Sequence, residues 1–246
     1  MLHHTPCIEC HTNNPLEIIW SSGEINSNLF AVCTCPNGHM TISGLMTELF
    51  DTLYKSAVDA YLKKCLSESV MSFAASLERA YELFTKIVLL KQSCTYEQIE
   101  DYWKEIKNQS ERQYGAFCFC YLFATKEVWH MDSKIIEFRN KVVHKGFIAT
   151  SVEVKAYAQY ITNCLSKIIK IIKSDFDTER SKIYFLQKEA ASSIIEKVMK
   201  EFTTAKYAAS GNPSLLKWNY ANYEEATFEE ALETSNQLVQ KHGFHL

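Results

Sequence analysis

The stretch "VMSFAASLERAYELFTKIVLLK", residues 70–91, sets the fold class. Its large apolar residues recur every three or four positions, the spacing of one face of a helix; they are Phe73, Leu77, Tyr81, Phe84 and Val88. Neither glycine nor proline interrupts the stretch. We therefore predict a long amphipathic helix that buries one face in a core.

Helical patterns continue on both sides of this stretch, over residues 43–66, 95–106, 112–124, 132–146, 151–173, 181–202 and 228–242. Thr95 and Gln98 have the spacing of a capping box, Asp132 is a plausible N-cap, and Gly243 should end the last helix. Residues 112–124, "RQYGAFCFCYLFA", are apolar nearly all round, which predicts the centre of a bundle. With only 7 Gly and 4 Pro in 246 residues, a loop-rich all-β fold is excluded. We predict a mainly α protein.

The first 40 residues differ in character from the rest. Residues 15–20 and 28–35 are typical of two short strands, separated by the turn-forming "SSGEINS". We therefore expect three parts: a small β domain over residues 1–41, a helical bundle over 42–202, and a loop and helix over 203–246 that pack on the bundle.

The small β domain carries metal-ligand spacing. Cys7 and Cys10 are two residues apart, and Cys35 and His39 flank a Pro-Asn-Gly turn. Two such chelating pairs suit a tetrahedral structural Zn²⁺, which can supply folding energy that few apolar side chains provide. The pattern resembles a zinc ribbon in which His39 replaces the usual fourth cysteine. Cys33 competes with Cys35, because both face the same side of a strand; the turn between the ligands favours Cys35.

Composition narrows the cellular setting. The other five of the nine cysteines are scattered through apolar helical stretches, as reduced core thiols are. The N-terminus has no apolar signal-peptide core, and no apolar run approaches the roughly 20 residues that span a bilayer. The net charge of −3 means that any nucleic-acid contact should be local. We expect a cytoplasmic protein without a membrane partner.

The stretch "EFRNKVVHKG", residues 137–146, has two apolar stripes. Ile135, Phe138 and Val142 form one, which we assign to the core, and Ile136 and Val143 form the second, roughly 100° away. Arg139 flanks the second stripe on one side, with Asn140 and His144 on the other. Two stripes indicate either a central helix or a partner on the second face. A two-fold partner would gather two Arg139 and two His144 around one cleft.

These residues, in an all-helical bundle, resemble the HEPN superfamily, whose signature is an Arg, a polar residue, and a His four to six positions after the Arg. Arg139, Asn140 and His144 match it, and Gly146 follows at a frequent position. The segment "SFAASLERAYELF" is similar to an early HEPN helix. The resemblance covers roughly residues 45–175.

The resemblance implies a metal-independent endoribonuclease that acts as a homodimer on an RNA substrate, through attack of the ribose 2′-OH. His144 would be the general acid or base, Arg139 would bind the scissile phosphate, and Asn140 would support them. Glu78 is the candidate for an acidic residue from a neighbouring helix. Such proteins serve as toxins or antiviral defence effectors, with a cognate inhibitor or defence partner protein. The alternative is a non-catalytic dimerisation or regulatory module whose ribbon binds a protein or RNA.

Overall fold

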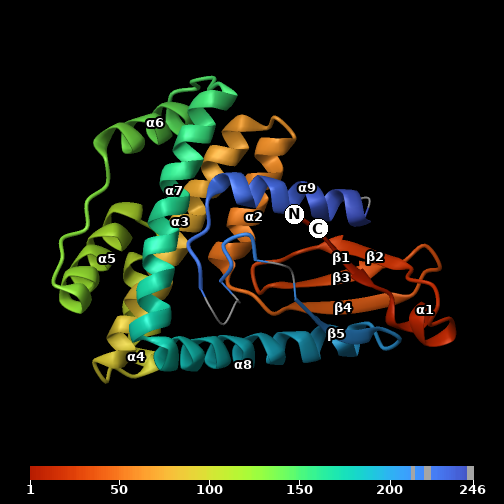
Figure 1. Ribbon diagram of the computed structural model, residues 1–246. Helices are drawn as coiled ribbons and strands as arrows, with labels where there is room; N and C mark the ends of the chain where they lie inside the picture. The colour runs from red at the N-terminus through yellow and green to blue at the C-terminus, as the bar shows by residue number, and fades with distance from the viewer. Residues whose placement is uncertain (212–213, 219–222, 243–246) are drawn as a thin grey trace. The chain divides into compact units, whose positions relative to one another are not determined.

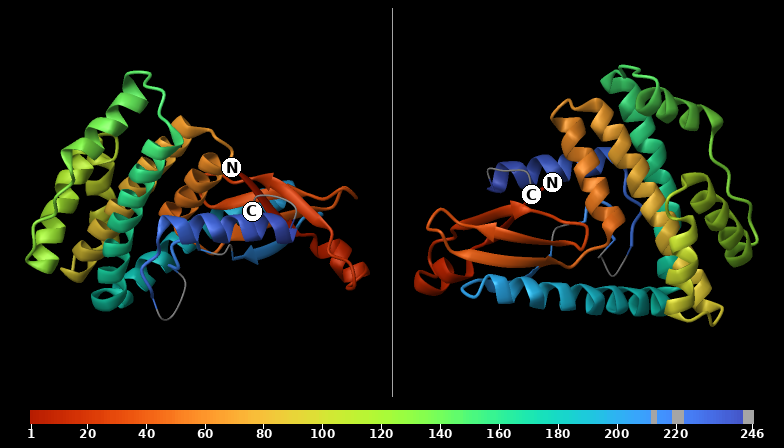
Figure 2. Two further views of the ribbon diagram at one scale, coloured as in Figure 1. Left: turned by 45° about the horizontal axis from the view of Figure 1, so that its top comes forward. Right: turned by 180° about the vertical axis from the view of Figure 1, so that it is seen from behind.

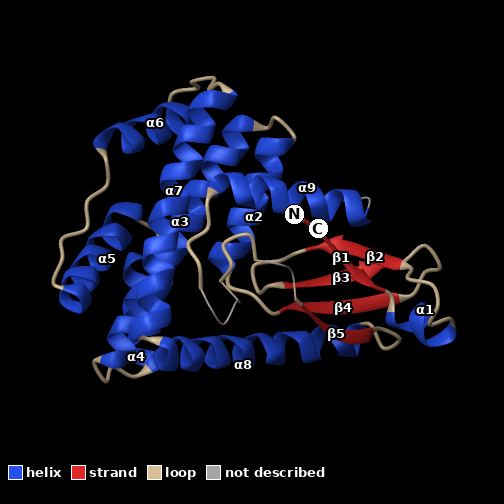
Figure 3. Ribbon diagram, viewed as in Figure 1, coloured by secondary structure: helices blue, strands red, loops and turns tan. Residues whose placement is uncertain are grey.

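The computed structural model describes residues 1–211, 214–218 and 223–242, and it divides into two compact units. One unit comprises Met1–Glu48, Phe185–Pro213 and Leu238–Leu246, and the other comprises Leu49–Tyr184 and Ser214–Gln237. The described chain is mainly helical, with a five-stranded sheet in the first unit (Figure 3). The expected mainly α class with a small N-terminal β part is therefore confirmed at that level.

The second unit is a helical bundle built around α3 (Figure 1). Its helices are α2 (Leu49–Leu62), α3 (Leu66–Lys91), α4 (Tyr96–Ile106), α5 (Ser110–Thr125), α6 (Ser133–His144), α7 (Ser151–Asp175), the start of α8 (Asp177–Glu201) and most of α9 (Phe228–His242). The predicted apolar face of α3 is buried, and Phe73 and Phe84 are completely enclosed. Phe228 of α9 joins the same core through an edge contact with the ring of Phe73, 5.6 Å between centroids.

Helix starts in the bundle follow their local sequence. Thr95 and Gln98 make the predicted capping box, with the Thr95 hydroxyl accepting from the Gln98 N–H at 3.3 Å. Asp132 caps α6 by accepting from the Lys134 N–H at 2.8 Å. The last helix has the predicted bounds, 228–242, whereas Gly243 lies outside the described residues.

Helix α5 contradicts the prediction that residues 112–124 form the bundle centre. Only Gln113, Phe117 and Tyr121 are buried, and the side chain of Phe119 is 78% exposed. The three buried residues lie four apart, so α5 packs by a single narrow face. Phe119, Leu122 and Phe123 remain exposed, while smaller side chains such as Cys118 and Ala124 are only partly buried against the core.

The first unit contains the sheet, in the order β1-β2-β3-β4-β5. Its strands are β1 (Leu2–Pro6), β2 (Trp20–Glu24), β3 (Phe30–Thr34), β4 (Met40–Leu45) and β5 (Lys206–Ser210), with the short helix α1 (Ile8–Asn13) between β1 and β2. The first four strands are antiparallel neighbours. Phe30 and Ile42 are buried on one face, where they pack with Ile194 and Val198 of α8 and with Phe202, which directly follows that helix.

Strand β5 pairs in parallel with β4, beside which it lies in the ribbon views (Figure 1 and Figure 2). Thr41 is opposite Lys206, and Leu45 is opposite Ser210. The predicted pair of strands at 15–20 and 28–35 is therefore wrong in number, and the first of them is a turn and loop up to Trp20. The compact units also differ from the expected boundaries at 41/42 and 202/203, because residues 185–211 belong with the sheet.

Candidate functional site

The first candidate site is a group of four side chains in the sheet unit. Cys7 follows β1 and is the N-cap of α1, where its sulfur accepts a hydrogen bond from the Cys10 N–H at 3.5 Å. Because α1 turns the chain directly after Cys7, the side chain of Cys10 comes back beside it. The two cysteines are buried.

The second pair lies in the hairpin between β3 and β4. The Cys35 N–H donates to the His39 carbonyl at 3.0 Å, and the Gly38 N–H donates to the Cys35 carbonyl at 2.9 Å. Gly38 has φ +80°, a left-handed conformation that favours glycine. This tight turn directs Cys35 and His39 to the same side, as the Pro-Asn-Gly sequence predicts.

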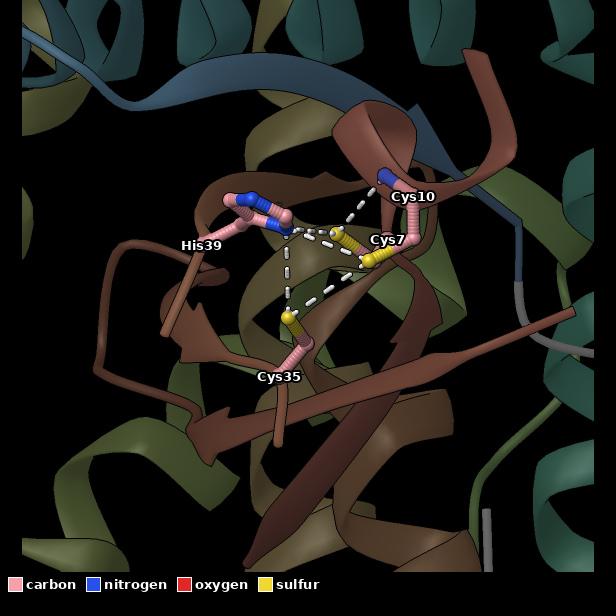
Figure 4. A group of neighbouring side chains, drawn as sticks. All are labelled: Cys7, Cys10, Cys35 and His39. Atoms are coloured by element: carbon pink, nitrogen blue, oxygen red, sulfur yellow. Dashed lines mark hydrogen bonds between the residues drawn. The ribbon is translucent and has the colours of Figure 1, made fainter. Parts of the chain in front are cut away.

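The two pairs converge on one point (Figure 4). The Nδ1 atom of His39 is 3.8 Å from the sulfur of Cys7, 3.1 Å from that of Cys10 and 3.7 Å from that of Cys35. The sulfurs of Cys10 and Cys35 are 3.9 Å apart. All four ligand atoms lie within 4.8 Å of one another, so this group could bind a metal ion.

Hydrogen bonds favour thiolate at Cys7, whereas at Cys10 the Asn37 amide lowers the pKa but burial and the neighbouring Cys7 and Cys35 raise it overall. Burial alone would raise the pKa of the Cys7 thiol, but the Cys10 N–H and the neighbouring side chains lower it to about 7. The Asn37 amide donates to the Cys10 sulfur at 3.3 Å. We did not anticipate a role for Asn37, although its place inside the Pro-Asn-Gly turn is the signal that could have indicated one.

Cys33 lies outside the group. Its completely buried thiol donates to the His3 carbonyl at 4.0 Å, and burial raises its pKa to about 11. A neutral thiol in an apolar setting is a poor metal ligand. The choice between Cys33 and Cys35 that the sequence left open therefore falls on Cys35.

The second candidate site lies at the end of α6 in the helical bundle. The helix stops after His144, where the N–H groups of Lys145 and Phe147 both donate to the Lys141 carbonyl at 3.1 Å, and Gly146 follows with φ +64°. His144 therefore occupies the exposed last turn of the helix.

Four polar side chains meet at this helix end. The Nη1 atom of Arg139 is 3.1 Å from Nε2 of His144 and donates to Oδ1 of Asn140 at 3.1 Å. Glu78, which comes from α3, places its carboxylate 3.6 Å from Nη2 of Arg139. The structure thus brings together all four residues that the sequence analysis named. We call Glu78, Arg139, Asn140 and His144 the Arg–His cluster.

The contact with arginine suits one tautomer of the imidazole. A guanidinium can only donate hydrogen bonds, so in this contact Nε2 of His144 is the acceptor, which corresponds to the tautomer with its proton on Nδ1. The Nε2 lone pair accepts from Arg139 here, so His144 can take a proton from a hydroxyl group once the guanidinium turns to an anion such as a phosphate.

Tyr157 of α7 is a neighbour of the cluster that the sequence analysis missed. Burial raises the pKa of its hydroxyl, while the charge of Arg139 lowers it and that of Glu78 raises it. No local pattern marks Tyr157, because it reaches this place only through the packing of α7 against α3 and α6.

The surroundings of the cluster include exposed apolar side chains. Ile136 of the predicted second stripe is exposed, and Val143 is half-buried. The connection to α7 adds Phe147 and Ile148, and the first turn of α7 adds Val152; Ile148 is 88% exposed. Since only Val142 of α6 is buried, α6 is not a central helix.

Comparisons with known proteins return no relative from which a family could be read. No family model matches the chain, no curated protein is similar to it, and no solved structure matches it. Within the described ranges, none of the helices is sufficiently long and apolar to cross a membrane.

Proposed function

We propose that this protein is a HEPN-type endoribonuclease that acts as a homodimer. The observation that carries the proposal is the 3.1 Å contact between Arg139 and His144 at an exposed helix end, with Asn140 and Glu78 beside it. This is an acid–base group next to an anion-binding group, the pair that phosphodiester cleavage without a metal requires.

The reaction follows from these groups. His144 of one protomer takes the proton of the ribose 2′-OH, and the 2′ oxygen attacks the adjacent phosphorus. The bond to the 5′ oxygen breaks, and that oxygen is protonated by the second His144 of the dimer. The products are a 2′,3′-cyclic phosphate and a 5′-OH. Arg139 binds the phosphate oxygens and stabilises the charge that develops on them. Asn140 and Glu78 hold the guanidinium in place.

The homodimer is proposed because each chain places one histidine, His144, in the Arg–His cluster, whereas the reaction uses both a general base and a general acid. Exposed Ile136 and Ile148 flank the Arg–His cluster in sequence and provide apolar surface for a second copy. A two-fold axis near the end of α6 would bring two clusters to one groove.

We further propose that the four-residue group in the sheet unit holds a structural Zn²⁺. Tetrahedral zinc with Zn–S of about 2.3 Å and Zn–N of about 2.0 Å places sulfurs about 3.8 Å apart and sulfur and nitrogen about 3.5 Å apart. The Cys10 and Cys35 sulfurs, 3.9 Å apart, and the distances of 3.8 and 3.7 Å from His39 to Cys7 and Cys35 are close to these values, whereas the 3.1 Å from His39 to Cys10 is shorter. Three cysteines and one histidine fill all four positions, which is typical of a structural ion. The sheet unit would then present the RNA or a partner protein to the bundle, in a toxin or antiviral defence effector.

One observation favours a second candidate, a non-catalytic dimerisation or regulatory module. The guanidinium of Arg139 already has three partners within the chain, so the cluster can also serve only to fix the end of α6 to α3. In that case the sheet unit would be the recognition element.

Cleavage of a mixed RNA pool in a buffer without added Mg²⁺ or Mn²⁺ and without chelator, which leaves the proposed structural zinc in place, tests the ribonuclease. Arg139→Ala and His144→Ala should each lower the rate by roughly 10²–10⁴-fold, because each removes a group used in the transition state. Arg112→Ala and His130→Ala, which change exposed residues of the same types outside the cluster, should cleave like wild type. The products should carry 2′,3′-cyclic phosphates, and 2′-O-methyl RNA should resist. Equal rates in all five proteins, or no RNA cleavage by wild type, would refute the proposed activity.

A further inference from the structure

A cavity of about 250 Å³ opens beside the Arg–His cluster, inside the helical bundle. It lies among α3, α5, α6 and α7, and Arg139, Asn140 and Glu78 form one part of its wall. The rest of the wall is largely apolar, with Ala74 and Ile161 among its members. A concave apolar site with a few polar groups at one side is the usual form of a small-molecule site.

Three tyrosines give the cavity its chemistry. Tyr81, Tyr114 and Tyr157 all line it, and the rings of Tyr81 and Tyr114 lie 5.7 Å apart. Tyr81 is already stacked on Phe117 at 4.1 Å, whereas Tyr114 is only half-buried. The ring of Tyr114 is therefore available to stack against a flat ligand.

The hydroxyl of Tyr157 is the second observation. The residue is 3% exposed, and within the part of the chain that the structure describes its hydroxyl makes no hydrogen bond. By contrast, the Tyr81 hydroxyl reaches the sulfur of Met131 at 3.4 Å. Although the residue as a whole is buried, its hydroxyl is not enclosed by protein and Tyr157 lines the cavity, so a polar atom of a ligand can reach this hydroxyl.

We propose that this cavity is the base-binding subsite of the RNA substrate. An unstacked nucleobase enters the cavity, stacks on Tyr114 and receives or donates a hydrogen bond at the Tyr157 hydroxyl, while its phosphate lies at Arg139. Single-stranded RNA bases are recognised by aromatic stacking together with hydrogen bonds to their edges. The volume suits a base with part of its ribose and is below the roughly 300–1,000 Å³ of sites for larger ligands.

The identity of the ligand as RNA rests on the proposed ribonuclease. The position of Arg139 in the cavity wall is an independent reason to expect an anionic ligand. A guanidinium in the wall favours a ligand with an anionic group over a purely apolar one. A nucleotide combines a flat base with a phosphate, whereas a fatty acid offers no flat ring to Tyr114 and an indole offers no anionic group to Arg139. The cavity would thus set which nucleotide stands next to the scissile phosphate.

Direct binding of the four ribonucleoside 5′-monophosphates to the full chain tests the inference without any need for catalysis. Ala74→Met fills the cavity from α3 with three additional heavy atoms and should weaken binding at least about tenfold. Tyr157→Phe removes only the hydroxyl and should weaken it about three- to tenfold. The matched control is Ala116→Met, the same change in a separate cavity of about 350 Å³ that α3, α4 and α5 line, and it should bind like wild type.

The outcomes separate this inference from the activity. Binding that is lost in Ala74→Met and retained in Ala116→Met supports the subsite, even if RNA is never cleaved and the ribonuclease fails. No binding by wild type up to roughly 10 mM, equal binding by all variants, or binding of indole in place of nucleotides overturns the subsite. RNA cleavage whose base preference is unchanged in Ala74→Met and Tyr157→Phe also overturns it, while the proposed activity stands.

Discussion

Replacing Cys35 by serine removes one of the four side chains that converge in the sheet unit, and replacing Cys33 by serine makes the same chemical change two residues away. The sulfur of Cys35 is 3.7 Å from Nδ1 of His39 and 3.9 Å from the Cys10 sulfur. The sulfur of Cys33 instead contacts the carbonyl of His3. We expect Cys35→Ser to lose zinc and Cys33→Ser to retain it.

The size of the effect of Cys35→Ser depends on how few other contacts stabilise the four-residue group. Apart from the three cysteines, the local apolar cluster contains only the partly buried Ile19, whose burial contributes at most about 1.5–3 kcal/mol. Loss of an outer partner of a metal ligand costs roughly 10–100-fold in affinity, so loss of a ligand itself should exceed about 100-fold, or about 2.7 kcal/mol. That loss matches the whole contribution of Ile19, so α1 and the 35–39 turn should open locally. The strands should persist, because Phe30 and Ile42 have their own core.

Zinc content and hydrogen exchange measured on the same samples test this. Wild type and Cys33→Ser should hold about one zinc per chain, whereas Cys35→Ser should hold much less and exchange rapidly over residues 7–14 and 35–39. Cys33→Ser should still unfold more easily, by about 1–3 kcal/mol, because its buried hydroxyl lacks a near partner. Equal zinc content in the two variants would refute the assignment of the ligands.

Three further predictions concern the two units. A Cβ at Gly23 would come within 2.7 Å of the carbonyl carbon of Val32, so Gly23→Ala should destabilise the sheet by about 1–3 kcal/mol. A Cβ at Gly115 of α5 would point into open space, so Gly115→Ala should stabilise the bundle by up to about 1 kcal/mol. Urea denaturation measures both changes. Thr150→Ala removes the capping box of α7 and should cost about 1 kcal/mol at neutral pH. Hydrogen bonds from the Thr150 backbone and side chain lower the pKa of Glu153. The stabilisation from Glu153 is therefore present above its unfolded pKa and is lost as the pH falls through its folded pKa. The free energies of unfolding of wild type and Thr150→Ala should differ less at acid pH than at neutral pH. Ile148→Asp should weaken self-association in sedimentation experiments, whereas Ile18→Asp, an exposed change in the sheet unit, should not.

The helices could be predicted from the sequence because their signals are local. The stripe of α3, the capping box at Thr95 and the bounds of α9 all depend on residues a few positions apart. Helix α5 shows where this reasoning fails. A uniformly apolar sequence does not say which face will be buried, and only packing determines that Phe117 is enclosed while Phe119 is exposed.

The strands were poorly predicted because they depend on distant partners. Strand β4, "MTISGL", overlaps a segment that continues into a helical pattern, and β5, "KYAAS", has Tyr207 as its one large apolar side chain, too few for a strand pattern. Their pairing joins residues that no local window contains. The metal-ligand group could be predicted because its ligands stand in two short motifs, Cys7 with Cys10 and Cys35 with His39. The approach of Glu78 to Arg139 was only a guess from neighbouring helices, and Tyr157 had no signal at all.

The parallel pairing of β4 with β5 has a consequence for biosynthesis. Thr41 leaves the ribosome 165 residues before its partner Lys206, which is roughly 10–30 s at about 5–20 residues per second. Throughout that interval β4 is an open edge, a template for pairing with other chains. However fast the intervening helices fold, the edge of β4 cannot be covered by β5 until synthesis has passed residue 210. Expression should therefore be sensitive to slow translation between these strands, and a fragment that ends before β5 should aggregate even with its zinc ligands intact.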